Sequence, residues 1–308
     1  MERKQASERN KILEYIFYSN YFYGLCAVTL SIEASLQQRI PLNGFLYFFL
    51  VFITTVLYYS YPYVRACSVI SNNLRTNWYT RHYGLMRWNQ VVCMIILLLS
   101  TILFITHYTK ELVSMPLHHW VLIFIFPLVA AFYYGVNFLS GKFNLRKLGC
   151  AKPFIIGFTW AGMVTIYPVL YYDSIHQLRF KTDWISVLLF LKNFMFISVL
   201  CIMFDIKDYA GDYLSRLSTF VVKIGLRKTL FKILLPLSFL GLASFICYGS
   251  LHHFSTGKLV LNIIPFILLI IVSISLKKRK PLLYYLAVID GLMVAKSVCG
   301  IIAMQYFS

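Results

Sequence analysis

WISVLLFLKNFMFISVLCIMFDIKDYAGD, residues 184–212, joins a long apolar run to a short cluster of acids. About twenty apolar residues form a helix that is long enough to cross the hydrocarbon core of a bilayer. The run shows no alternation of polar and apolar positions, which a membrane-spanning β-strand would have. Because a chain in lipid must satisfy its backbone hydrogen bonds internally, we predict a transmembrane helix over residues 184–204.

The rest of the chain is also strongly apolar and poor in charged residues. Of its 308 residues 59% are hydrophobic and 13% are charged, 11 residues are acidic, and the mean hydropathy is +0.71. A soluble domain of this length would carry more charge on its surface. We predict an all-α, polytopic membrane helix bundle, with residues 1–308 forming a single transmembrane domain. The nine predicted spans cover approximately residues 12–33, 41–61, 89–108, 118–137, 154–172, 184–204, 231–250, 258–276 and 282–305.

The basic residues predict the orientation of these spans. With the N-terminus inside, 22 of the 29 Lys and Arg residues fall in inside segments and five in outside segments. Such a bias is typical of cytoplasmic loops, so it also explains the net charge of +18 without a nucleic-acid partner. We expect a multi-pass protein of a bacterial cytoplasmic membrane, with its N-terminus in the cytoplasm and its C-terminus outside.

Two inside connections, residues 62–88 and 205–230, are longer than the outside ones. Long connections in a compact protein are usually functional or disordered. These two are rich in apolar and aromatic residues, which argues against disorder. We therefore expect them to form a cap over a site on the cytoplasmic side.

Three of the acids lie together in the second connection. Asp205, Asp208 and Asp212 have the spacing i, i+3 and i+7, so they share one face if the helix continues. Their repulsion would be relieved by Mg²⁺, which binds one or two carboxylates together with substrate phosphates. The sequence therefore indicates a Mg²⁺–diphosphate site with these three as catalytic and metal-binding residues. The alternative is that they face water and pair with Lys207 and Arg216.

This acidic stretch resembles the second aspartate motif of the UbiA superfamily of intramembrane prenyltransferases. That motif, D-x-x-D-x-x-x-D, follows the sixth of nine helices, and a T-L-x-V-x-x-G stretch comes seven residues after its last Asp. Here Thr219-Phe-Val-Val222-Lys-Ile-Gly225 stands at that offset, although Arg216 replaces a frequent Gly. The segment with Leu145-Arg146, Lys152, Trp160 and Pro168 is also similar to a basic segment of some family members. The resemblance implies that Arg146 contacts the diphosphate.

The family's first aspartate motif, N-D-x-x-D-x-x-x-D, is missing. No Asp or Glu lies between Glu33 and Glu111, and the stretch from Ser71 to Asn77 offers only neutral or basic side chains. Either arginines of this connection bind the diphosphate directly, as their bidentate geometry permits, or catalysis has been lost. The predicted diphosphate-binding residues are Arg75, Arg146, Lys152, Lys207, Asn72, Asn73 and Asn77.

Two functions remain open. The first is a Mg²⁺-dependent prenyltransferase that moves a prenyl group from an allylic diphosphate to a lipophilic acceptor, with an isoprenoid diphosphate and membrane lipids as partners. The second is an inactive relative that binds a lipid or scaffolds other membrane subunits. A transporter is disfavoured because no clear internal repeat is found.

Among the polar residues in the apolar runs, we expect Lys192 to extend to the outer interface, and Asp290 and Lys296 not to pair within their helix.

Overall fold

The computed structural model describes residues 11–65, 74–134, 149–176, 184–214, 216–278 and 280–307, and over these ranges it contains helices and no strand. The all-helical prediction is confirmed. The chain divides into two compact units, one of Met1–Val28 with Asn43–Val113 and one of Thr29–Leu42 with Ser114–Ser308. The prediction of one domain with a cap made by both connections stays a prediction.

The described part of the first unit begins with a helical segment, residues 11–18, which is followed by a turn at Ser19 and Asn20. Asn20 has a φ of 71°, a left-handed conformation that Asn tolerates better than most residues, so the predicted first span is broken there. Within this unit α3 packs on α5 and on α4. Its further helices are the first part of α2 (Tyr21–Gln37), α3 (Phe45–Arg65), α4 (Leu74–Arg81), α5 (Tyr83–His107) and α6 (Thr109–Val113).

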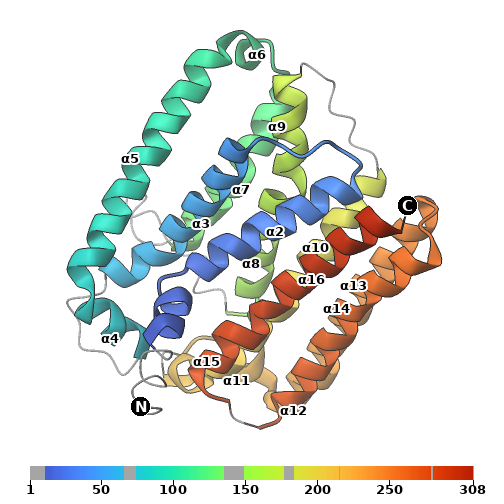
Figure 1. The fold of residues 1–308 in the computed structure, drawn as a ribbon. Coiled ribbons are helices and arrows are strands. Elements are labelled where there is room, and N and C mark those ends of the chain that lie inside the picture. Colours follow the sequence, from blue (N-terminus) through green and yellow to red (C-terminus); the bar gives the residue numbers. More distant parts are fainter. Residues whose placement is uncertain are drawn as a thin grey trace, which may run out of the picture. The chain divides into compact units, whose positions relative to one another are not determined.

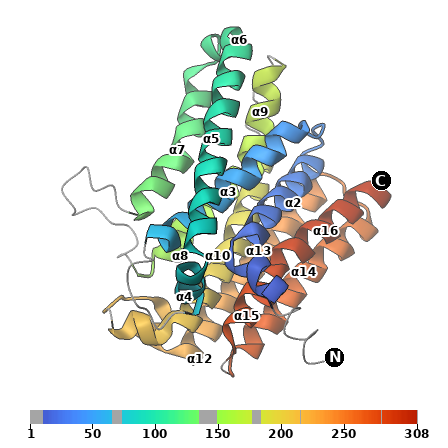
Figure 2. The same cartoon turned by 60° about the vertical axis from the view of Figure 1, so that its left-hand side comes forward.

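The second unit is built around α10, which packs against α8 on one side and α13 on another. Figures 1 and 2 both show α14 and α16 running alongside one another, in agreement with their close packing. Besides the end of α2, the described elements are α7 (Leu117–Tyr134), α8 (Lys152–Ala161), η2 (Gly162–Ile166), α9 (Tyr167–Ile175), α10 (Trp184–Leu214), α11 (Phe220–Ile224), α12 (Leu226–Thr229), η3 (Leu230–Leu234), α13 (Leu235–Leu251), α14 (Thr256–Ser275), α15 (Leu282–Tyr284), η4 (Tyr285–Ile289) and α16 (Gly291–Tyr306).

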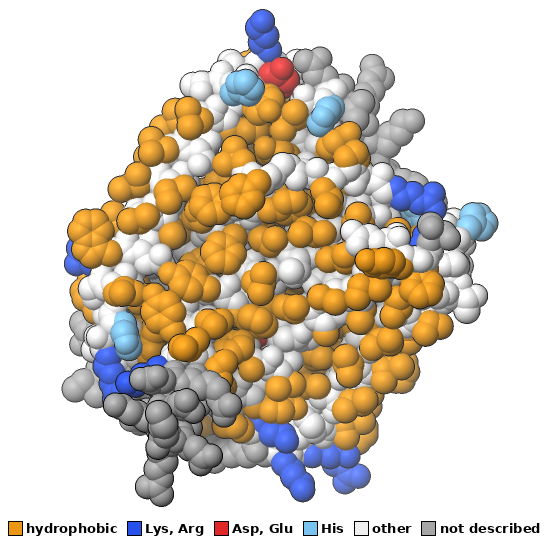
Figure 3. Space-filling view, viewed as in Figure 1, with side chains coloured by type: hydrophobic (Ala, Val, Ile, Leu, Met, Phe, Trp, Pro, Cys, Tyr) orange, Lys and Arg blue, Asp and Glu red, His pale blue; other side chains and the backbone are white. Residues whose placement is uncertain are grey.

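Each predicted span overlaps at least one described helix, but the count of nine spans stays a prediction. Seven continuous helices of the described chain are long and apolar enough to cross a membrane. The apolar helix Leu117–Tyr133 and α2 have 17 residues each and fall just below that length. These helices expose apolar side chains on their outer faces. On α14 the exposed residues are Val260, Ile264, Ile267, Ile271 and Ile274. Figure 3 shows hydrophobic side chains over most of the face drawn, with few charges among them.

Both long connections contain more helix than predicted. The helix predicted to start at residue 89 begins at Tyr83, and the one predicted to stop at 204 continues to Leu214. Helices α11 and α12 then occupy much of the stretch before residue 230. The reason is that an apolar window marks only the lipid-facing part of a helix, whereas the backbone hydrogen bonds continue into the polar turns beyond it.

Two spans contain a wider, π-helical turn next to a proline. The η2 turn precedes Pro168, and η3 precedes Pro236. Proline has no amide hydrogen and its ring crowds the carbonyl four residues earlier, so a local widening lets the helix continue. In η2 the Thr165 carbonyl accepts a hydrogen bond from Gln38 Nε2 at 2.9 Å, so a side chain just after α2 satisfies this backbone group.

Candidate diphosphate site at the end of α10

The acidic motif lies on the last three turns of α10. This helix has 31 residues, so it is about 46 Å long and exceeds the roughly 30 Å hydrocarbon core. Because the helix is continuous to Leu214, the predicted i, i+3, i+7 arrangement of Asp205, Asp208 and Asp212 is confirmed. Asp205 is fully buried and Asp212 is 8% exposed, whereas the Asp208 side chain is 45% exposed. Asp205 and Asp212 are therefore buried in the second unit, and Asp208 between them reaches its surface.

Asp205 is held by a lysine from another helix. Lys152, the first residue of α8, places its Nζ 2.7 Å from Asp205 Oδ1. The charge of Asp212 acts on both members of this pair. Asp205 Oδ2 is buried and has no hydrogen-bond partner among the described residues. One oxygen of this carboxylate is thus neutralised by Lys152, and the other is buried without such a partner among the described residues.

A close approach of two helix backbones brings these side chains together. A Cβ atom added to Gly157 of α8 would lie 2.2 Å from Ser198 Oγ and 3.0 Å from the Phe194 carbonyl oxygen of α10. Only a residue without a side chain fits at that distance. Since Lys152 lies little more than one turn before Gly157 on α8, this contact keeps the start of α8 against the acidic end of α10.

The neighbouring basic residues have different partners. Lys207 Nζ lies 3.1 Å from Asp208 Oδ1, and both side chains are partly exposed. This pairing is the one expected if the acids merely face water, and pairs of this kind contribute at most about 1 kcal/mol. Arg216 is exposed and has a φ of 53°, a left-handed conformation that favours glycine. The backbone here thus explains why a Gly is suited to this position of the motif.

Arg75 lies in the first unit and is 5% exposed. Its Nε and one of its terminal nitrogens donate to the carbonyl oxygens of Tyr18 and Phe17, each at 3.1 Å, and it also donates to Asn20 Oδ1. Its guanidinium carbon lies 4.7 Å from the centre of the Tyr63 ring. These contacts hold α4 against the first helical segment and against α3, so Arg75 has a clear structural role. Its predicted contact with a diphosphate stays a prediction.

The remaining predicted residues are less well placed. Asn77 is half-buried on α4. Asn72, Asn73 and Arg146 lie outside the described residues, so their predicted contacts with a diphosphate stay predictions. Over the described ranges, no group of three or more His, Cys, Asp or Glu side chains could hold a metal ion. The donors that the structure offers, one buried carboxylate oxygen and the exposed Asp208, suit Mg²⁺ that is completed by substrate phosphates and water.

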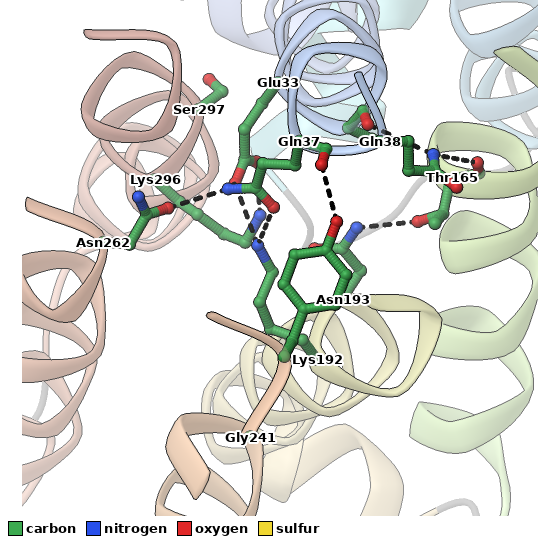
Figure 4. Close-up of polar contacts among 12 residues, drawn as sticks. Glu33, Gln37, Gln38, Thr165, Lys192, Asn193, Gly241, Asn262, Lys296 and Ser297 are labelled. Carbon is green, nitrogen blue, oxygen red and sulfur yellow. Dashed lines mark hydrogen bonds and ion pairs between the residues drawn. The ribbon is translucent and has the colours of Figure 1, made fainter. Parts of the chain in front are cut away.

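Sequence reasoning missed a second polar group in the same unit. We expected Lys192 to extend to the outer interface, and this is wrong: its side chain is 1% exposed and its Nζ lies 3.1 Å from Glu33 Oε1. Lys296 of α16 contacts the other oxygen of the same carboxylate, as Figure 4 shows. A signal was present in the sequence, because all three charged residues fall within apolar runs, where ionisable side chains usually mark function.

Comparison with known proteins supports the fold. No family model matches the sequence, and no curated protein matches it. A solved structure does match, described as "Structural and mechanistic insights into the biosynthesis of Digeranylgeranylglyceryl phosphate synthase in membranes", which concerns a UbiA-superfamily prenyltransferase. The match covers 96% of this chain and 99% of that chain with a TM-score of 0.56 and 18% identity. The chain is therefore an integral, multi-pass helical membrane protein with a UbiA-like fold.

Proposed function

We propose that the protein is an intramembrane prenyltransferase that transfers a prenyl group from an allylic diphosphate to a lipophilic acceptor. The observation that carries this proposal is the Lys152–Asp205 pair at the end of α10, in a fold shared with a prenyltransferase. A buried carboxylate with one oxygen neutralised by an ammonium group, and the other without a partner in the described part of the chain, suits a cation-bound diphosphate.

The basic and the acidic side chains at the end of α10 have different roles. Lys152 and Lys207 supply ammonium groups that bind diphosphate oxygens and stabilise the charge that develops as the leaving group departs. Asp205 and Asp208 would hold Mg²⁺ together with substrate phosphates and water, and Asp212 would add its negative charge nearby; the metal would neutralise the diphosphate when bound. Arg146, Asn72, Asn73 and Asn77 are further candidate contacts. The apolar helices before the motif would keep water from the reactive prenyl carbon.

A second function is an inactive relative that binds a lipid or scaffolds other membrane subunits. The absence of any acid between Glu33 and Glu111 favours it, because a two-motif site would lose up to three carboxylates. The bond between Lys207 and Asp208 favours it as well, since it gives the most exposed acid a partner within the protein.

Binding of geranylgeranyl diphosphate to the purified full-length protein tests the site. We expect Mg²⁺-dependent binding that is weakened at least tenfold in Asp208→Asn. The matched control is Asp173→Asn, since Asp173 lies about 32 Å from Lys152 along the continuous helix Lys152–Ile175. Equal binding by the two variants, or no Mg²⁺-dependent binding by the parent protein, would exclude the proposed site.

A measurement of catalytic turnover distinguishes the prenyltransferase from the inactive relative. We expect release of inorganic pyrophosphate when a lipophilic acceptor fraction is supplied with the bound diphosphate. If the diphosphate binds with Mg²⁺ but no pyrophosphate is released with any acceptor, the site is a binding site only, and the inactive relative is the correct reading.

A further inference from the structure

Three charged side chains from three helices meet inside the second unit. Glu33 lies on α2, Lys192 on α10 and Lys296 on α16, and the side chains are 1%, 1% and 3% exposed. We call these three residues the buried triad (Figure 4). The triad lies 13 residues, or about 20 Å, before Asp205 along α10, so it is separate from the candidate diphosphate site.

The Glu33 carboxylate is the centre of the triad. Its Oε1 accepts from Lys192 Nζ at 3.1 Å and from Gln37 Nε2 at 2.9 Å, and its Oε2 accepts from Lys296 Nζ at 2.5 Å. Lys192 Nζ also donates to Gln37 Oε1 at 2.6 Å. A Cβ atom added to Gly300 would lie 2.5 Å from Glu33 Cγ, so the glycine of α16 makes room for the acid.

A shell of neutral polar groups surrounds the triad. Gln37 Nε2 also donates to Asn262 Oδ1 of α14 at 2.8 Å, and the Tyr248 hydroxyl of α13 donates to the Gln37 carbonyl oxygen at 2.6 Å. The other faces of the two lysines are aromatic, with Phe245 and Phe196 rings at 5.3 and 5.7 Å. This shell contains no further carboxylate among the described residues, so it cannot balance a second positive charge.

The charges of the triad do not cancel if all three groups ionise. Two ammonium groups and one carboxylate leave a net positive charge in a buried site, which is costly without a counter-ion. The hydrogen bonds lead to the same conclusion. Two ammonium groups carry six N–H donors, but the described contacts offer them three acceptor oxygens. A neutral amine has one donor fewer, and its lone pair can accept from the other lysine.

We infer that Glu33, Lys192 and Lys296 form a proton-binding site in which the folded protein keeps one of the two lysines as a neutral amine. The two lysines share one proton, which either of them can hold. In its neutral form the triad has one carboxylate and one ammonium, which cancel. Binding of a proton makes the site cationic, and release of that proton restores the neutral state.

The other ionisable groups that face the triad do not change this balance. Tyr248 of α13 and Cys299 of α16 both interact with Glu33. Both are neutral in their usual state at neutral pH, so neither adds a charge to the site. The side chains that face the triad from α14 and from the rest of α2 are the amides Asn262 and Gln37. The proton therefore resides on the lysine pair.

The pH dependence of stability tests this inference. An unfolded lysine stays protonated up to about pH 10, so the unfolded chain binds one more proton than the folded chain, and stability rises with pH. For the full-length protein in detergent, we expect the folded-to-unfolded ratio to gain about tenfold per pH unit from the triad between pH 7.5 and 9. Unfolding by SDS titration at several pH values measures it.

Variants isolate the contribution of the triad. Lys192→Met and Lys296→Met each leave one lysine paired with Glu33, so we expect both to lose this tenfold gain per pH unit. The control Lys232→Met removes an exposed lysine of the same unit and should keep it. If the Met variants do not fold, Lys192→Arg serves: its side chain stays charged, so Lys296 must be the neutral amine and the gain should be kept. The parent slope in either Met variant, or loss of the gain in Lys192→Arg, would overturn the inference.

Discussion

The pair of Lys152 and Asp205 permits a quantitative test of how the candidate site is held together. We consider Lys152→Met and Asp205→Asn, alone and combined. Nζ and Oδ1 lie 2.7 Å apart, the Asp205 side chain is fully buried and that of Lys152 is 18% exposed. Either single change leaves one charged group without its partner, whereas the double variant removes both charges from the same place.

The burial of each residue determines the expected costs. Lys152→Met leaves a carboxylate that water does not reach, so we expect a loss of about 3–5 kcal/mol in the free energy of unfolding. Asp205→Asn leaves an ammonium that is partly solvated and keeps an amide oxygen beside it, so about 2 kcal/mol is expected. The double variant should lose less than the sum of the two, by a coupling energy of about 2–3 kcal/mol.

Unfolding by SDS titration in mixed micelles, with helical circular dichroism as the signal, measures all four proteins at one pH. The matched control is the cycle of Lys207→Met and Asp208→Asn, because that pair is partly exposed and its coupling should stay below about 1 kcal/mol. Additive losses in the Lys152–Asp205 cycle, or equal coupling in both cycles, would show that this pair does not hold α8 against α10.

Three further outcomes are expected. Gly300→Ala should destabilise the protein by about 1–3 kcal/mol, since its Cβ atom would lie 2.5 Å from Glu33 Cγ, and unchanged unfolding would show that the helices move apart freely. Arg75→Gln should cost about 2 kcal/mol by leaving buried carbonyl oxygens unpaired, and loss of diphosphate binding without loss of stability would instead assign Arg75 to the site. Removal of Mg²⁺ with EDTA should weaken geranylgeranyl diphosphate binding in the parent protein but hardly in Asp208→Asn, as measured by calorimetry; equal weakening in both would place the metal elsewhere.

The helices and the acidic motif were predictable because each depends on local sequence. An apolar run of about twenty residues has no partner for its backbone groups in lipid except itself, so residues 184–204 had to be helical. The spacing of Asp205, Asp208 and Asp212 is a property of one helix and needs no knowledge of its neighbours. The helix ends were less predictable, because the turns beyond the membrane are stabilised by packing and not by hydropathy.

The partners of the charged residues were decided by the tertiary structure alone. Lys152 and Asp205 are 53 residues apart, and Glu33 is 159 residues from Lys192 and 263 from Lys296. A helical period tells which face of its own helix a side chain occupies, but not which other helix that face meets. That choice follows from how closely two helices can pack, as at Gly157, and from the room left for a side chain, as for Glu33 at Gly300. The sequence by itself therefore determined a helical membrane protein with an acidic motif, and only the packing of its helices decided which charges neutralise one another.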